Sequence, residues 1–130
     1  MIGLDTGALI DVFKQNISLK KILDETDESF VSTIINYQEL LFGLDFDNPG
    51  HAEEEKVYSL FFEHLPLLPL TSLAAKKAAM LFRELQKKGM GVGRFDSMIG
   101  GILLEHGVKK IITRNARHFE RIKELEVISY

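Results

Sequence analysis

Three carboxylates, Asp5, Glu39 and Asp96, are the acidic side chains of this chain whose placement could support chemistry. Two carboxylates about 4 Å apart repel each other by roughly 4 kcal/mol at an effective dielectric constant of about 20. A cluster of three would therefore keep a proton on one acid or bind a divalent cation. The chain has no cysteine and no two histidines at ligand spacing, so its oxygen donors favour Mg²⁺ or Mn²⁺.

Whether these acids meet depends on the elements that carry them. Asp5 follows a predicted strand, and Glu39 lies about one turn into the helix after the second strand. In open α/β sheets, ligands bind outside the carboxyl ends of the strands. Asp96 begins the helix before the fourth strand, at the opposite edge unless the Gly91–Gly93 loop carries the chain back. Asn115 follows the fourth strand. The topology therefore allows the acids to converge without requiring it.

Apolar runs and helix-stop signals predict an α/β fold with a mostly parallel central sheet between helices. The chain shows no repeat, low-complexity tract or linker, so we expect one domain over residues 1–130. Strands are expected at 1–4, 30–34, 66–69, 109–113 and 127–129. Helices are expected from about 6 to 15, after 18, from 35 to 46, from 49 onward, from 72 to 89, from 95 to 106 and from 115 to 122.

The composition is that of an ordinary globular protein, with 45% apolar and 27% charged residues among 130. No apolar stretch reaches the roughly 20 residues needed to span a bilayer, and no signal peptide is recognised. The absence of cysteine fits a reducing cytoplasm. Residues 1–75 contain 4 Lys and Arg against 13 Asp and Glu, whereas residues 76–123 contain 12 against 4. The basic second half could attract a polyanion.

Four segments in order carry a family resemblance: LDTG at 4–7, STIINYQELLFG at 32–43, GRFDSMIGGILLEHG at 93–107 and KKIITRNARHFERIKELEVI at 109–128. Together they resemble a PIN domain, and more narrowly the VapC-type toxins of prokaryotic toxin–antitoxin pairs. The resemblance covers essentially the whole chain. It implies a PIN-like three-layer fold and a Mg²⁺- or Mn²⁺-dependent endoribonuclease that cuts single-stranded or structured RNA. It also implies a homodimer and a small antitoxin partner.

Residue by residue, the resemblance assigns metal binding to Asp5, Glu39 and Asp96. It assigns supporting catalytic roles to three polar neighbours, Thr6, Thr113 and Asn115. Asn115 departs from the pattern, because many relatives have a fourth acid there, and its neutral carbonyl would hold a second ion more weakly. Three arginines near these motifs are candidate RNA-phosphate ligands, namely Arg94, Arg114 and Arg117.

Simpler interpretations remain open for each position. Asp5, Asp96, Thr113 and Asn115 could cap helices, and Glu39 could be a solvated helix residue. The main functional alternative is a catalytically inactive RNA-binding or scaffolding PIN-like domain. A haloacid-dehalogenase-type phosphatase is disfavoured because Gly7 stands where its second aspartate belongs, and the second strand carries no acid for a receiver domain. The apolar stretch 59–70 is a candidate dimer face, with core packing as its alternative.

Overall fold

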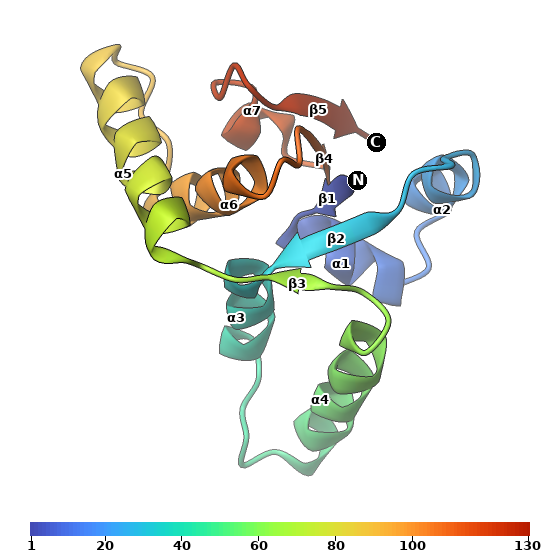
Figure 1. Ribbon diagram of the computed structural model, residues 1–130. Helices are drawn as coiled ribbons and strands as arrows, with labels where there is room; N and C mark the ends of the chain where they lie inside the picture. The colour runs from blue at the N-terminus through green and yellow to red at the C-terminus, as the bar shows by residue number, and fades with distance from the viewer.

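A five-stranded parallel sheet forms the centre of the molecule (Figure 1). The computed structural model describes residues 1–130. The strands are β1 (Ile2–Leu4), β2 (Phe30–Thr33), β3 (Leu67–Leu68), β4 (Lys110–Thr113) and β5 (Glu126–Ser129). They lie in the order β3-β2-β1-β4-β5, and every neighbouring pair is parallel. The predicted α/β class with a parallel sheet is confirmed.

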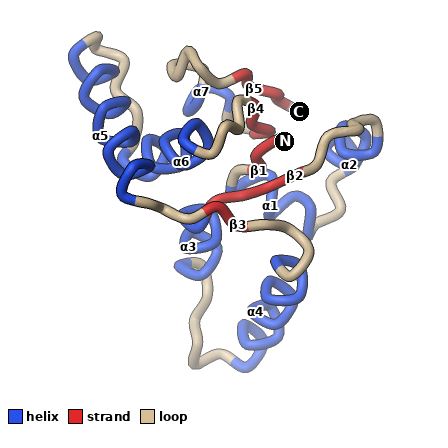
Figure 2. The backbone as a smooth tube through the Cα atoms, in the orientation of Figure 1, coloured by secondary structure: helices blue, strands red, loops and turns tan.

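Seven helices connect the strands and flank the sheet (Figure 2). They are α1 (Thr6–Phe13), α2 (Ile17–Asp24), α3 (Ile34–Phe42), α4 (Pro49–Phe62), α5 (Ser72–Lys87), α6 (Arg94–Glu105) and α7 (Ala116–Phe119). The chain starts in the middle of the sheet, runs outward to β3, and returns through α5 and α6 to place β4 beside β1. This reversal of strand order leaves a ligand crevice at the carboxyl ends of β1 and β4.

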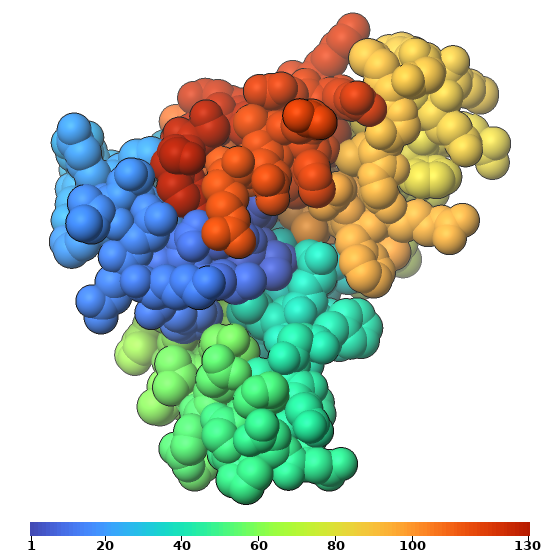
Figure 3. All heavy atoms as spheres, turned by 180° about the vertical axis from the view of Figure 1, so that it is seen from behind, coloured from blue at the N-terminus to red at the C-terminus, as the bar shows by residue number.

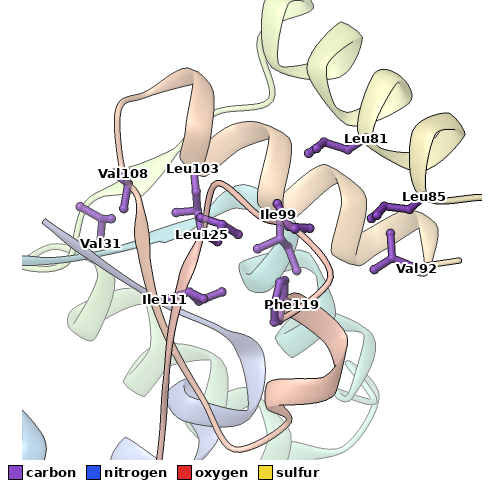
Figure 4. Close-up of a cluster of buried hydrophobic side chains, with 11 residues drawn as sticks. Val31, Leu81, Leu85, Val92, Ile99, Leu103, Val108, Ile111, Phe119 and Leu125 are labelled. Atoms are coloured by element: carbon purple, nitrogen blue, oxygen red, sulfur yellow. The ribbon is translucent and has the colours of Figure 1, made fainter. Parts of the chain in front are cut away.

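Two hydrophobic cores cover the two faces of the sheet. One core packs α5, α6 and α7 against β2 and β4, and it includes the buried side chains of Leu103 and Ile111 (Figure 4). The other packs α1, α2 and α3 against the opposite face, and there Ile112 is fully buried. Ile111 and Ile112 serve different cores because successive strand side chains point to opposite faces. Burial on both faces holds the carboxyl ends of β1 and β4 in fixed register.

Local capping sets most helix boundaries. The Asp5 side chain caps α1, and Gly89 and Gly107 follow α5 and α6 with positive φ angles of 68° and 75°. The predicted extension of α3 to residue 46 is wrong, since α3 ends at Phe42. There the Asp45 carboxylate accepts a hydrogen bond from the Asp47 N–H, which favours a turn over a continued helix.

Two other helix predictions also need correction. The second helix begins at Ile17, earlier than expected, because the Asn16 side chain caps it by accepting from the Leu19 N–H. The last helix is only four residues long, from Ala116 to Phe119. Its remaining expected residues pass into turns toward β5. Neither difference moves a strand end, so the crevice at the carboxyl edge is unaffected.

Helix α4 and the segment before it form a lobe at one end of the molecule (Figure 3, green and teal). On its inner side, Phe61 packs edge-on against Phe13 and Phe62 packs edge-on against Tyr37. No α4 residue is fully buried, and Leu60 is 62% exposed. Phe61 and Phe62, which belong to the stretch considered as a dimer face, therefore pack inward. The outer side of α4 is exposed.

Candidate active site

Asp5 joins the ends of the two central strands. Its Oδ1 accepts a hydrogen bond from the Ala8 N–H at 2.8 Å, and its Oδ2 accepts one from the Thr113 hydroxyl at the end of β4. Thr113 is fully buried, and its Oγ1 also accepts from the Asn115 N–H at 2.9 Å. The side chain of Asp5 therefore does more than cap α1: it is fixed between β1 and β4 at the base of the crevice.

A partly buried chain of hydrogen bonds orients Glu39. The Thr6 hydroxyl donates to Glu39 Oε1 at 2.7 Å and accepts from Asn36 Nδ2 at 3.0 Å. Asn36 is fully buried, and its Oδ1 accepts from the Thr33 hydroxyl at 2.7 Å. Sequence reasoning missed Asn36 as a site residue. Its signal was the capping box formed with Thr33 at the start of α3.

Asp96 reaches the same edge of the sheet from α6. The open question was whether the Gly91–Gly93 loop carries the chain back over the sheet, and it does. Asp96, in the first turn of α6, lines one cavity with Asp5 and Glu39, so α6 begins at the carboxyl edge and delivers the chain to the start of β4. His118 on α7 lies beside Asp96, with its Nδ1 3.1 Å from Asp96 Oδ2. This contact was not predicted, since histidines were considered only as metal ligands and no two stand at ligand spacing.

One cavity of about 820 Å³ collects these side chains. Phe82, Phe95, Ile99 and Phe119 give it apolar walls. Most residues singled out from the sequence line it, namely Asp5, Thr6, Glu39, Arg94, Asp96 and Asn115. Thr113 lies beneath it as the support of Asp5. The structure thus brings together three acids that come from different elements and lie far apart in sequence.

The acids influence one another inside the cavity. Burial raises the pKa of the Asp5 carboxyl above its ordinary 3.8; the Thr113 and Ala8 hydrogen bonds partly oppose this, and the Glu39 carboxylate adds to it. Burial also raises the pKa of Asp96, where the nearby Glu39 and Asp5 carboxylates raise it further and His118 opposes them. These mutual effects are those of a carboxylate cluster that holds protons when no cation compensates it.

The donor set fits a hard divalent cation. Mg²⁺ usually keeps several water ligands and uses only one or two carboxylates, which an oxygen-lined cavity of this size can accommodate. No three acidic or histidine side chains are close enough to form a complete metal site as they stand. Asp5 and Glu39 each already accept a hydrogen bond from a threonine hydroxyl. An ion held here would therefore combine a few carboxylate oxygens with water.

The three predicted arginines occupy different places. Arg94 lines the cavity, and its guanidinium carbon lies 5.9 Å from the centre of the Phe82 ring. Arg114 is paired with Asp11 on α1, with 3.1 Å from its Nη1 to each carboxylate oxygen. Arg117 is exposed on α7 and does not line the cavity. Of the three, Arg94 is the one that reaches the acids' cavity directly.

A family model for the PIN domain matches residues 2–125 of this chain. The chain belongs to the PIN domain family. It is 28% identical to Ribonuclease VapC1 of Methanocaldococcus jannaschii, over 99% of this chain and 86% of that protein. It is 27% identical to the tRNA(fMet)-specific endonuclease VapC of Shigella flexneri, over 92% and 89% respectively. The resemblance to VapC-type proteins indicated by the sequence is confirmed.

Solved structures of other proteins have the same fold as this PIN domain. The DNA-bound VapBC complex of Salmonella typhimurium contains a chain that matches with a TM-score of 0.84 and 25% identity, covering 98% of this chain and 96% of that one. A chain in the DNA-bound VapBC2 complex of Rickettsia felis matches with a TM-score of 0.83 and 20% identity, covering 100% and 99%. No helix here has the length and apolar character to cross a membrane.

Proposed function

We propose that this PIN domain is a Mg²⁺- or Mn²⁺-dependent endoribonuclease and the toxin of a toxin–antitoxin pair. The observation that carries the proposal is the convergence of Asp5, Glu39 and Asp96 on one cavity at the carboxyl edge of the sheet. The names of the similar VapC proteins support RNA as the substrate. The basic second half of the chain supports a polyanionic substrate.

The acids have separate tasks in this proposal. Asp5 is the fixed ligand, because Thr113 and Ala8 hold both of its oxygens. Glu39 and Asp96 would bind the ion directly or through water and accept a proton from the attacking water. The ion, when bound, stabilises charge on the scissile phosphate and on the attacking oxygen. Asn115 at the fourth position orients water, since its amide has no charge with which to hold a second ion.

Other cavity residues position the RNA. Arg94 lies at the cavity wall, where its guanidinium can pair with a backbone phosphate. Phe95 also lines the cavity, and its ring stacks with that of Phe42 at 22° between planes and 6.5 Å between centroids. Exposed aromatic faces suit unpaired bases, so the cavity favours a single strand or a loop over a closed duplex.

The proposed partners follow from the same relatives. The similar structures are VapBC complexes, and one of them belongs to the VapBC family of toxin–antitoxin systems, so we expect a cytoplasmic antitoxin to neutralise this chain. We also expect a homodimer. Exposed apolar side chains available for such contacts include Leu60 on α4 and Leu73 on α5. Induced expression should arrest growth, and Asp96→Ala should relieve the arrest.

The direct test is cleavage of RNA by the purified chain with Mn²⁺ or Mg²⁺ and its loss in Asp5→Asn. Asparagine is an equally good helix N-cap, so this change removes the charge while α1 keeps its start. We expect the cleavage rate to fall at least about 100-fold. Asp27→Asn is the matched control, because Asp27 is exposed and does not line the cavity. This variant should cleave normally. RNA binding without cleavage under any divalent ion would instead favour an inactive RNA-binding domain.

A further inference from the structure

Asp11 is a buried carboxylate that the proposed mechanism leaves unused. Its side chain is only 6% exposed, on the face of α1 turned toward the residues that follow β4 and β5. Arg114 donates from Nη1 to both of its oxygens, at 3.1 Å each. The Tyr130 hydroxyl donates to Asp11 Oδ2 at 2.6 Å. A buried charge without partners is costly, and here one cation and one hydroxyl from distant parts of the chain supply them.

Arg114 lies across Gly7 toward the acids. A Cβ atom on Gly7 would stand 3.1 Å from Arg114 Nε and 3.6 Å from Asp5 Oδ1, so glycine leaves the space that the arginine fills. Gly7 itself lines the acid cavity. The guanidinium is therefore held at the edge of this cavity, beside Asp5. Its side chain is 44% exposed, and the pairing with Asp11 uses Nη1 alone. Nε and Nη2 donate no hydrogen bond within the protein and can still pair with an acceptor.

We propose that Asp11 and Tyr130 are positioning residues that hold Arg114 at the cavity edge as an anchor for a phosphate of the RNA strand. The inference rests on the proposed function, because RNA must be the ligand of the cavity. A free arginine side chain loses considerable rotamer entropy when it binds a phosphate. Here Asp11 has already ordered it, so the planar guanidinium presents fixed donors at a fixed place.

The direction in which Asp11→Asn changes RNA affinity separates the positioning of Arg114 from the effect of net charge. Replacing Asp11 by asparagine removes a negative charge near the binding site of a polyanion. By charge alone, this change would strengthen RNA binding. If Asp11 acts by holding Arg114, the same change weakens binding. A loss of affinity in Asp11→Asn therefore cannot come from net charge.

The experiment compares Asp11→Asn, Tyr130→Phe, Arg114→Ala and the double variant Asp11→Asn/Arg114→Ala. The probe is a fluorescein-labelled single-stranded oligoribonucleotide, measured by anisotropy with Ca²⁺ and by cleavage kinetics with Mn²⁺. We expect Kd and KM to rise about tenfold in Asp11→Asn and Arg114→Ala, and about threefold in Tyr130→Phe, with kcat within about twofold of the parent. In the Arg114→Ala background, Asp11→Asn should add nothing further.

Two controls separate the positioning of Arg114 from its charge and from the stability of the fold. Arg114→Lys retains the charge without the planar donors and should recover only part of the lost affinity. Thermal unfolding shows whether each variant is folded, and a variant that melts earlier while its Kd and KM stay unchanged assigns Asp11 a purely structural role. Unchanged or tighter RNA binding in Asp11→Asn, additive losses in the double variant, or a parent chain that does not bind RNA would each overturn the inference.

The same measurements distinguish this inference from the proposed function. Anisotropy reports RNA binding even if the parent chain cleaves nothing, so a failure of catalysis leaves the role of Asp11 measurable. Manganese binding by calorimetry should be the same in Asp11→Asn and the parent, since Asp11 does not line the acid cavity. Loss of manganese binding in Asp11→Asn would mean that it supports the metal site instead, which contradicts the proposal.

Discussion

Each acid of the candidate site has a partner of its own within the protein. Asp5 accepts from Thr113, Glu39 accepts from Thr6, and Asp96 lies beside His118. These contacts fix the carboxylates without consuming all of their lone pairs, because a carboxylate has about four acceptor positions. The site can therefore be ordered before an ion binds. Mutation of groups that orient metal ligands in this way typically lowers metal affinity or activity by about 10- to 100-fold.

Thr113→Val tests this support at a single atom. Valine has nearly the same shape but removes the hydroxyl that donates to Asp5, so Asp5 loses one of its two fixing contacts. We expect manganese affinity and cleavage rate to fall about 10- to 100-fold. Thr113→Ser keeps the hydroxyl and is the matched control. Equal manganese affinity in the valine and serine variants would exclude a supporting role for the hydroxyl.

At this scale the sequence revealed residue types better than contacts. Asp5 ends an apolar strand, Glu39 interrupts an apolar run on its helix, and Asp96 borders the apolar face of its helix. By contrast, the contact between Asp11 and Tyr130 joins residues 119 positions apart. No local pattern signals such a contact, because it depends on β5 returning beside β4. The roles of the three acids stay predictions until cleavage and metal binding are measured.

At the scale of elements, the crossover from β3 to β4 decides where Asp96 lies. The sequence predicted both α5 and α6 but left the direction of the return open. Asp96 in the acid cavity shows that the chain returns to the carboxyl edge, and close packing holds α6 there: a Cβ atom on Gly101 would lie 2.7 Å from the Ala78 backbone nitrogen. The two helix backbones therefore approach each other directly at this point, since Gly101 and Ala78 are both small. That contact, which depends on backbone approach in three dimensions, fixes α6 relative to α5.

Gly101→Ala should consequently destabilise the fold and misplace α6. The added methyl group would meet backbone atoms, which cannot rotate away as a side chain can. Overpacking of this kind typically costs about 1–3 kcal/mol of unfolding free energy. Urea denaturation measures the cost. Gly91→Ala is the control, because a Cβ atom there meets nothing within 4 Å. A Gly101→Ala protein as stable as Gly91→Ala would mean that the helices separate easily.

At the scale of the whole molecule, the parallel sheet collects negative charge at one edge. Burial raises the pKa of both Asp5 and Asp96, so the folded chain binds these protons more tightly than the unfolded chain does. Between the ordinary pKa of about 3.8 and the raised value, the folded state carries the extra protons. The unfolding free energy contributed by these acids therefore decreases as pH rises through that interval. A bound cation should reverse this loss.

Asp5→Asn isolates the contribution of one acid, because asparagine resembles the protonated form of aspartate. Without divalent ions, we expect the parent and the variant to be similarly stable near pH 4. As pH rises further, the parent should become less stable than the variant, since only the parent acquires the buried charge. Urea denaturation of both proteins across this pH range measures the difference. A difference that does not change with pH would show that Asp5 titrates alike in the folded and unfolded chains.

Manganese should restore that lost stability in the parent protein and much less in Asp5→Asn. A ligand that binds only the folded state stabilises it by about 2.7 kcal/mol at a concentration 100 times its Kd. At neutral pH the parent should therefore gain several degrees in Tm with saturating Mn²⁺, while Asp5→Asn gains much less. Asp27→Asn, an exposed acid, should respond as the parent does. Equal manganese shifts in all three proteins would place the ion outside the acid cavity, because removing the Asp5 carboxylate would then leave its binding unchanged.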